Sequence, residues 1–284
     1  MKEHLLSRAV ISALLVFVPL GTALADGALE RVRKEGVRVG FANEAPFTFS
    51  QSDGSLAGSD YELAKLVFQQ IGVQKFEGVL VNFGSLIPGL KAHRFDIISA
   101  GLYVRPERCP QILFSEPDVV VGDTVIVPKG NPHNIHSFAD VAKQPGVKIG
   151  GTTGGLAKDA LDDGVPKDQI VEFPDWVSAI SALKAGRIDA ALQTTVTARW
   201  TVKSANDPAI EVASPFTQPV INGKPKANYA AFAFNTDDKD LRDAFNAQLE
   251  KVLGSPEQIA IFAKYGMTPD EIPTGVKLAQ ICAQ

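Results

Sequence analysis

The sequence predicts an α/β protein made of two similar lobes, and two observations carry this prediction. Apolar runs typical of strands alternate with helical patterns along the chain, which favours βαβ units and a mostly parallel sheet. In addition, residues 85–96 and 178–189 share Ser, Ile, Leu, Lys, Ala, Arg and Asp at seven of twelve positions. Each copy lies between an amphipathic helix pattern and an apolar strand. A half-sized structural unit used twice therefore explains them better than a chance similarity between two helix-to-strand turns.

The individual elements follow from local patterns. Strands are predicted at residues 37–41, 78–82, 95–100, 123–127, 147–150, 170–173, 188–192 and 229–234. One helix is predicted to begin at the capping-box pattern from Ser59 to Glu62 and to end at Gly72. Further helices are predicted at residues 85–93, near 156, from the cap at 175, at 241–252 and at 255–265.

The first 25 residues have the pattern of a secretory signal. A basic start precedes the apolar residues 9–20, and residues 23–25 form a small-x-small cleavage pattern. A membrane anchor is the alternative, but it needs roughly 20 apolar residues, and the run here is shorter and contains a proline. We therefore expect cleavage after Ala25 and a mature periplasmic protein that starts at Asp26.

Composition and charge exclude some functions. The chain has 284 residues, of which 45% are hydrophobic, so it can bury a core. Its formal net charge of −4 argues against a nucleic-acid partner and against a cationic membrane-surface role. Both cysteines, Cys109 and Cys282, follow the predicted signal. An even count in an oxidising compartment favours one disulfide, with two unpaired thiols as the alternative.

Catalytic and metal-binding patterns are mostly absent from the sequence. The histidines fit neither HExxH nor a Cys/His zinc motif, so we expect no catalytic residue, no metal and no cofactor. The Gly/Thr segment 150–155 lacks the pattern of a nucleotide-binding loop. It lies between a predicted strand and a predicted helix, where the N–H groups and hydroxyls of Thr153, Gly154 and Gly155 could hold a small carboxylate. An ordinary turn that needs glycine fits equally well.

Three successive predicted strands each end in an aromatic side chain, and two of them also in a charge. Glu44 and Phe47 follow the first strand, Phe83 follows the second, and Tyr103 and Arg108 follow the third. The carboxyl ends of parallel strands are where open α/β sheets bind ligands. Aromatic faces attract delocalised cations, and a guanidinium suits a carboxylate. A small zwitterion is the ligand that matches this set.

Each of these residues also has an ordinary structural explanation. A single phenylalanine is more often part of a core, and a loop glutamate is usually solvated. Arg108 could pair with Glu107 or Glu116 at the surface. The convergence of all five at neighbouring strand ends favours the binding role.

The chain resembles the periplasmic solute-binding proteins of ABC importers, in the polar amino-acid-binding group. The matching motifs are residues 40–47, 57–63, 83–90, 95–101, 106–108 and 114–117. The resemblance implies two α/β lobes joined by two crossover strands, the type II arrangement, with the ligand in the cleft between them. Lobe I is then expected at residues 26–120 and 229–284, and lobe II at 121–228.

The resemblance also assigns ligand contacts. It implies that Arg108 grips a carboxylate, and Gly101, which ends a matching motif, is included among the binding residues. In amino-acid binders of this group a lobe II acid holds the α-ammonium, but this chain has Thr194 at that position. Burying an ammonium without an anion is costly, so an ordinary α-amino acid is disfavoured as the ligand.

Within the group, the chain is most similar to ectoine- and hydroxyectoine-binding proteins. That subgroup combines a Glu-x-x-Phe motif with two further aromatics and the arginine, which match Glu44, Phe47, Phe83, Tyr103 and Arg108. The lobe II acid is also missing there, and two cysteines recur, matching Cys109 and Cys282. The implied ligand carries a carboxylate and a delocalised cyclic amidinium.

Other functions remain open at this stage. One is a polar amino-acid binder in which another group, such as Glu44, takes the ammonium. Another is a periplasmic dehydratase on the same fold, for which Glu44 is the one candidate acid or base. A sensor or interaction module is a third. The expected partners are a small zwitterionic ligand and the membrane permease of an ABC importer, with no nucleic acid, for a protein that is itself a monomer.

Overall fold

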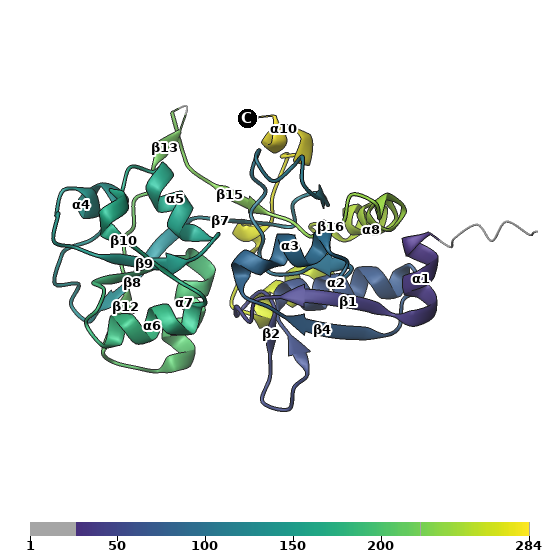
Figure 1. Cartoon of the computed structure of the whole chain (residues 1–284), viewed down its shortest axis with the longest axis horizontal. Coiled ribbons are helices and arrows are strands. Elements are labelled where there is room, and N and C mark those ends of the chain that lie inside the picture. Colours follow the sequence, from purple (N-terminus) through teal and green to yellow (C-terminus); the bar gives the residue numbers. More distant parts are fainter. Residues whose placement is uncertain (1–26, 222, 284) are drawn as a thin grey trace, which may run out of the picture.

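Two sheets with helices packed around them form two lobes that lie side by side (Figure 1). The computed structural model describes residues 27–221 and 223–283, so the predicted signal lies outside the described residues. The first sheet has the order β4-β1-β5-β16-β6, with bounds Phe76–Leu80, Val37–Phe41, Ile97–Ile98, Ala233–Phe234 and Leu113–Phe114. Strands β4, β1 and β5 are parallel, and β16 runs antiparallel to both of its neighbours.

The second sheet repeats this plan. Its order is β10-β9-β11-β8-β12, with bounds Ile170–Phe173, Ile149–Thr152, Ala190–Thr194, Asp123–Pro128 and Ile210–Val212. Strands β10, β9 and β11 are parallel, whereas β8 is antiparallel to β11 and β12. The predicted α/β class with two similar lobes is therefore confirmed. Each sheet is mixed, with three neighbouring parallel strands.

The helices belong to one lobe or the other. The first lobe has the helices α1 (Ala28–Glu35), α2 (Ser59–Gln70), α3 (Leu86–Lys91), α8 (Lys239–Val252), α9 (Pro256–Lys264) and α10 (Leu278–Cys282). It also has the short 3₁₀ helices η1 (Phe83–Ser85) and η3 (Pro269–Glu271). The second lobe has the helices α4 (Phe138–Ala142), α5 (Leu156–Asp162), α6 (Trp176–Lys184) and α7 (Thr195–Ala205) and the 3₁₀ helix η2 (Lys167–Gln169). No helix among the described residues is long and apolar enough to cross a membrane.

The internal sequence repeat corresponds to equivalent structure in the two lobes. In the first lobe, Asp96 accepts from the N–H of Arg38 at 2.8 Å and donates its own N–H to the Arg38 carbonyl at 2.9 Å. In the second lobe, Asp189 and Lys148 make the same two bonds at 2.7 and 2.8 Å. Each aspartate thus ties the turn before one parallel strand to the start of its neighbour. This is why Asp recurs at the end of both copies.

Two strands connect the lobes. Strand β7, Val119–Val121, leads into the second lobe, and β15, Asn228–Ala230, returns to the first lobe. The strands β7 and β15 pair with each other in antiparallel orientation. The return segment carries a hairpin of β13, Val220–Ile221, and β14, Lys224–Pro225, and a third strand pair joins β2, Phe49–Ser50, to β3, Leu56–Ala57. We propose that the lobe boundaries lie near residues 120 and 229, within β7 and β15.

Several predicted element boundaries were wrong. Ser59 is the first residue of α2 and not its cap, since Gly58 precedes the helix and no side chain caps it. The N–H groups of Ser59 and Asp60 instead donate to the carbonyls of Pro46 and Phe47, at 2.8 and 3.0 Å. Strand β4 begins and ends two residues before its predicted position, and the predicted strand 229–234 is split into β15 and β16.

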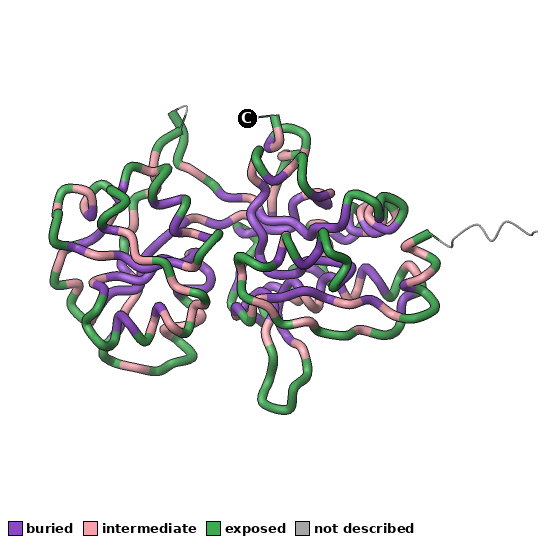
Figure 2. The backbone as a smooth tube through the Cα atoms, in the orientation of Figure 1, coloured by how far each residue is buried: buried purple, intermediate pink, exposed green. Residues whose placement is uncertain are grey.

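Buried apolar residues form two clusters in each lobe. Figure 2 shows that the buried stretches of the backbone run through the inside of each lobe. A further cluster lies where the lobes meet and includes Phe47, Tyr103, Val119, Val121 and Val196. Because Val196 belongs to helix α7 and the others come from the first lobe and the crossover, this cluster packs the two lobes against each other. It forms the apolar floor beneath the cleft.

Cys109 and Cys282 form a disulfide, with their Cα atoms 5.9 Å apart. The prediction of one bridge is confirmed. The bond ties helix α10 to the loop that follows strand β5, and this loop carries Arg108. A loop closed over 173 residues is worth about 5 kcal/mol in the chain-entropy model.

A candidate ligand-binding site between the lobes

A small cavity lies in the cleft and both lobes line it. The first lobe contributes Glu44, Phe83, Gly101, Tyr103, Arg105 and Arg108, and the second contributes Thr152, Gly155, Leu156, Gln193 and Thr194. The cavity measures about 20 Å³, which is room for little more than one water molecule. The structure is therefore that of a closed cleft, and a ligand requires the lobes to part.

Parallel strands of both sheets end at this cavity. Strands β1, β4 and β5 lead to its contacts on the first lobe, and β9 and β11 end in Thr152 and Thr194 on the second. A larger hollow of about 750 Å³ opens beside helix α1, at the opposite end of β1. Both arginines that line it, Arg31 and Arg38, already bind Asp96, at 2.9 and 2.7 Å. The interlobe cavity is therefore the better candidate.

Arg108 is buried and faces backbone carbonyls. It donates to the Tyr103 carbonyl at 2.7 Å and, across the cleft, to the Gly154 carbonyl at 2.8 Å. It pairs with neither Glu107 nor Glu116, so the surface ion pair considered as an alternative is not formed. Burial and the neighbouring Arg105 lower the pKa of Arg108 to about 9. A guanidinium this poorly compensated is a strong site for an incoming carboxylate.

Glu44 is also buried, with 9% of its surface exposed. Burial raises the pKa of its carboxyl to about 7, although hydrogen bonds from Gln193 and Thr197 of the second lobe act in the opposite direction. The loop that carries it is held by a bond from the Glu44 N–H to the Thr48 carbonyl, at 3.0 Å. A cation that binds beside this buried carboxyl strongly stabilises its ionised form.

The aromatic side chains divide into two groups. Phe83 and Tyr103 line the cavity, and the Tyr103 hydroxyl donates to Asp123 at 3.2 Å. Phe47 is 1% exposed and belongs to the apolar cluster beneath the cleft, and it does not line the cavity. Its ring packs under Gly101, where an added Cβ would come within 2.8 Å of it. Gly101 also has a positive φ of 57° and donates its N–H to Asp60 at 2.7 Å.

The Gly/Thr turn contributes acceptors to the cleft instead of the predicted donors. The N–H groups of Thr153 and Gly155 are bonded within the second lobe, to the Phe173 and Thr152 carbonyls at 2.9 and 3.0 Å. The carbonyl of Gly154 faces the first lobe and accepts from Arg108. Backbones also meet here, since a Cβ on Gly154 would lie 3.2 Å from the Cα of Gly84.

Thr194 caps a helix and lines the cavity. Its hydroxyl accepts from the N–H of Thr197 at 3.0 Å at the start of α7. The second-lobe residues that line the cavity carry no charge: Thr152, Gly155, Leu156, Gln193 and Thr194. The site therefore has Glu44 as the one carboxylate among its lining residues.

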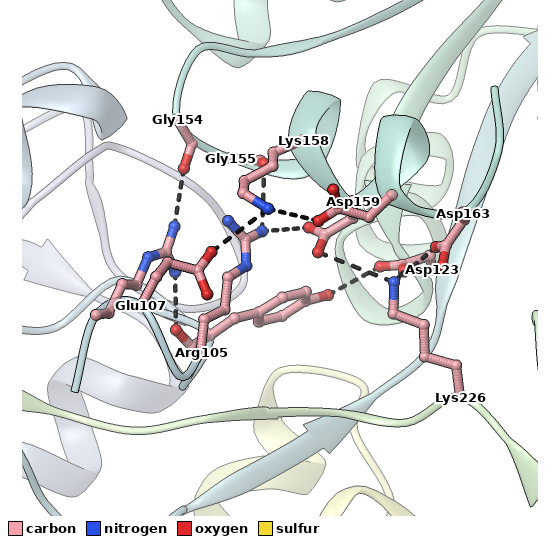
Figure 3. A network of polar contacts seen from close by, with 12 residues as sticks. Arg105, Glu107, Asp123, Gly154, Gly155, Lys158, Asp159, Asp163 and Lys226 are labelled. Carbon is pink, nitrogen blue, oxygen red and sulfur yellow. Dashed lines mark hydrogen bonds and ion pairs between the residues drawn. The ribbon is translucent and has the colours of Figure 1, made fainter. Parts of the chain in front are cut away.

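Sequence reasoning missed an ionic network at the edge of the cavity (Figure 3). Arg105, from the same loop as Arg108, pairs with Asp159 of helix α5 across the cleft. Lys226, on the crossover segment, lies 2.6 Å from Asp163, 3.8 Å from Asp123 and 3.9 Å from Asp159. Arg105 lies three residues before Arg108, which was a usable signal. No local pattern marks Asp159.

Comparison with known proteins agrees with this architecture. The model of the bacterial extracellular solute-binding proteins, family 3, matches residues 37–268. A probable amino-acid ABC transporter periplasmic-binding protein of Sinorhizobium fredii is 38% identical over 269 residues, which cover 93% of this chain and 88% of that protein. The lysine/arginine/ornithine-binding periplasmic protein of Escherichia coli is 32% identical over 190 residues, 66% of this chain and 70% of that protein.

Solved structures share the fold. EhuB in complex with hydroxyectoine is 34% identical, with a TM-score of 0.81, over 90% of this chain and 97% of that one. An ancestral amino acid-binding protein, a precursor of cyclohexadienyl dehydratase, is 28% identical, with a TM-score of 0.72, over 84% of this chain and 98% of that one.

The fold, the cleft and the family match lead to one assignment. The protein has the type II periplasmic binding protein fold, and its family consists of transport binding proteins and not of enzymes. It is a solute-binding protein of an ABC importer for polar amino acids or compatible solutes. The chain belongs to the bacterial extracellular solute-binding proteins, family 3.

Proposed function

We propose that this chain binds a small zwitterionic compatible solute, ectoine or hydroxyectoine, in the periplasm and delivers it to the membrane permease of an ABC importer. The mature protein starts at Asp26 after cleavage of the signal and acts as a monomer. The observation that carries the ligand assignment is the charge pattern of the cavity. Buried Arg108 lies on one lobe beside two aromatic rings and a single lining carboxylate, and the lining of the other lobe is uncharged.

Each part of the ligand has a counterpart in this pattern. The carboxylate suits Arg108, which has no acidic partner of its own. The amidinium is delocalised and weakly hydrated, so it suits the rings of Phe83 and Tyr103 together with Glu44. The likeness to EhuB, solved with hydroxyectoine, supports the same assignment. Binding then proceeds through closure of the second lobe over a ligand held by the first.

A polar amino acid is the second candidate. The Sinorhizobium fredii relative, a probable amino-acid transporter component, favours it. In that case Glu44 takes the α-ammonium, because it is the one carboxylate that lines the cavity.

Isothermal titration calorimetry separates the two candidates. The mature protein is titrated with hydroxyectoine, ectoine, glycine betaine, L-glutamine and L-arginine. We expect saturable binding of ectoine or hydroxyectoine and much weaker binding of the two amino acids. Binding of an amino acid without binding of either ectoine would overturn the assignment. Arg108→Ala removes the carboxylate contact, and Arg187→Ala, the same change at an exposed arginine of the second lobe, is its matched control.

A further inference from the structure

The second lobe does carry a carboxylate near the cavity, but the protein's own cation occupies it. Asp159 is 5% exposed and pairs with the Arg105 guanidinium of the first lobe. The same guanidinium reaches the Gly155 carbonyl at 3.3 Å. Both side chains are largely removed from water, with 11% of the Arg105 side chain and 7% of the Asp159 side chain exposed.

Arg105 stands between Asp159 and the ligand space. Arg105 lines the cavity and Asp159 does not. The guanidinium carbon lies 5.9 Å from the centre of the Tyr103 ring, a ring that also lines the cavity. Figure 3 shows the Arg105 side chain reaching toward Asp159, with Lys226 approaching from the other side. A ligand cation that paired with Asp159 would have to compete with Arg105 for this carboxylate.

We infer that Arg105 is a specificity-determining residue: by pairing with Asp159 it removes the second-lobe carboxylate from use as an ammonium site, and so disfavours ligands with a primary ammonium. The inference rests on the proposed function, since it explains why a delocalised cation is preferred. It assigns Arg105 the position that a ligand ammonium would otherwise take.

The energetics support this role. A ligand ammonium that took Asp159 would leave the Arg105 guanidinium without its anion in a buried site, which is strongly unfavourable. Glu44 is then the one lining carboxylate left for the ligand cation. A primary ammonium is compact and strongly hydrated and has three donors to satisfy, whereas a delocalised cation loses less hydration and can share Glu44 with aromatic faces.

The test compares four forms of the mature protein by calorimetry: the wild type, Arg105→Met, Arg105→Lys and the double variant Arg105→Met/Asp159→Asn. The probes are hydroxyectoine and L-glutamine. Arg105→Met removes the guanidinium from Asp159, which keeps only the more distant Lys226, at 3.9 Å, and leaves the site one positive charge short. We expect its affinity for L-glutamine to rise at least tenfold over the wild type. Arg105→Lys keeps a cation on Asp159 and should show no such rise, and Asp159→Asn in the double variant should abolish the gain.

Two results would overturn the inference: an unchanged glutamine affinity in Arg105→Met, or a gain that persists in the double variant. Circular dichroism and thermal melting confirm that each form is folded, and Arg105→Gln replaces Arg105→Met if the latter does not fold. Failure of the proposed function has a different signature, because it is read from the wild type with hydroxyectoine alone. The change in glutamine affinity and its dependence on Asp159 decide the inference in either case.

Discussion

The buried carboxyl of Glu44 makes the stability of the unliganded protein depend on pH. Its pKa is about 7 in the folded chain, against an ordinary value of 4.5, because burial disfavours the ionised form. Between these two values the folded state retains a proton that the unfolded chain has lost. The free energy of unfolding therefore falls as pH rises from 4.5 to 7, and this carboxyl accounts for about 3 kcal/mol of the fall.

Replacement of Glu44 by Gln isolates this contribution. Asp60 and Asp123 also have pKa values raised by burial, to about 6 each, so the wild-type profile contains their effects as well. The difference between wild type and Glu44→Gln cancels them. Urea denaturation at pH values from 4.5 to 8.5 should show the variant gaining on the wild type as pH rises, by up to about 3 kcal/mol. A constant difference across this range would refute the reasoning.

Ligand binding should show the opposite pH dependence through the same group. A bound cation stabilises the ionised carboxylate and lowers its pKa, so binding of an amidinium releases a proton near neutral pH. The affinity of the protein for hydroxyectoine should then fall as pH drops below 7, by up to tenfold for each pH unit. Calorimetry in buffers of different ionisation enthalpy measures the released proton, and Glu44→Gln should not release it.

Three further predictions concern named side chains. Arg108→Ala should weaken ligand binding at least 100-fold, since it removes the guanidinium that is proposed to bind the ligand carboxylate. The melting temperature of the unliganded protein should stay nearly unchanged, because burial of the guanidinium opposes its two bonds to the Tyr103 and Gly154 carbonyls; a large drop in that temperature would indicate a structural role. Phe47→Ala should lower the free energy of unfolding by about 3–5 kcal/mol in urea denaturation. Phe83→Ala should cost little stability but weaken ligand binding about tenfold in calorimetry. The reverse pattern would contradict the placement of the two rings. Cys109→Ser with Cys282→Ser should lower the free energy of unfolding by about 4–5 kcal/mol in urea, and an unchanged midpoint would mean that the bridge is not formed in solution.

The two-lobed plan was predictable because its signals are local. The motif that ends in Asp96 and Asp189 folds the same way in both lobes, since each aspartate bonds the start of a neighbouring parallel strand. The helix was predicted at the right place, but the capping role of Ser59 was wrong, because the N-terminal N–H groups of the helix donate to the carbonyls of Pro46 and Phe47. A contact of that kind depends on how a preceding loop folds, and the capping-box pattern cannot show it.

The sequence predicted which strand ends form the site, but it did not predict which side chains point into the cavity. Phe47 and Phe83 both follow strands, yet the loop that carries Phe47 folds back and packs its ring under Gly101. The pair Arg105 and Asp159 is 54 positions apart and joins two lobes, so its existence depends on how they close. The second lobe therefore does have an acid near the cavity, Asp159 and not a residue at position 194, but this acid is already paired with Arg105.

A crystal structure of the mature protein grown with hydroxyectoine tests the central claim most directly. We predict that the ligand carboxylate lies within hydrogen-bond distance of Arg108 and that its ring lies between Phe83 and Tyr103 with the cation toward Glu44. The pair of Arg105 and Asp159 should be intact in that structure. A ligand carboxylate bound elsewhere, or a cation seated on Asp159 with Arg105 displaced, would contradict the account.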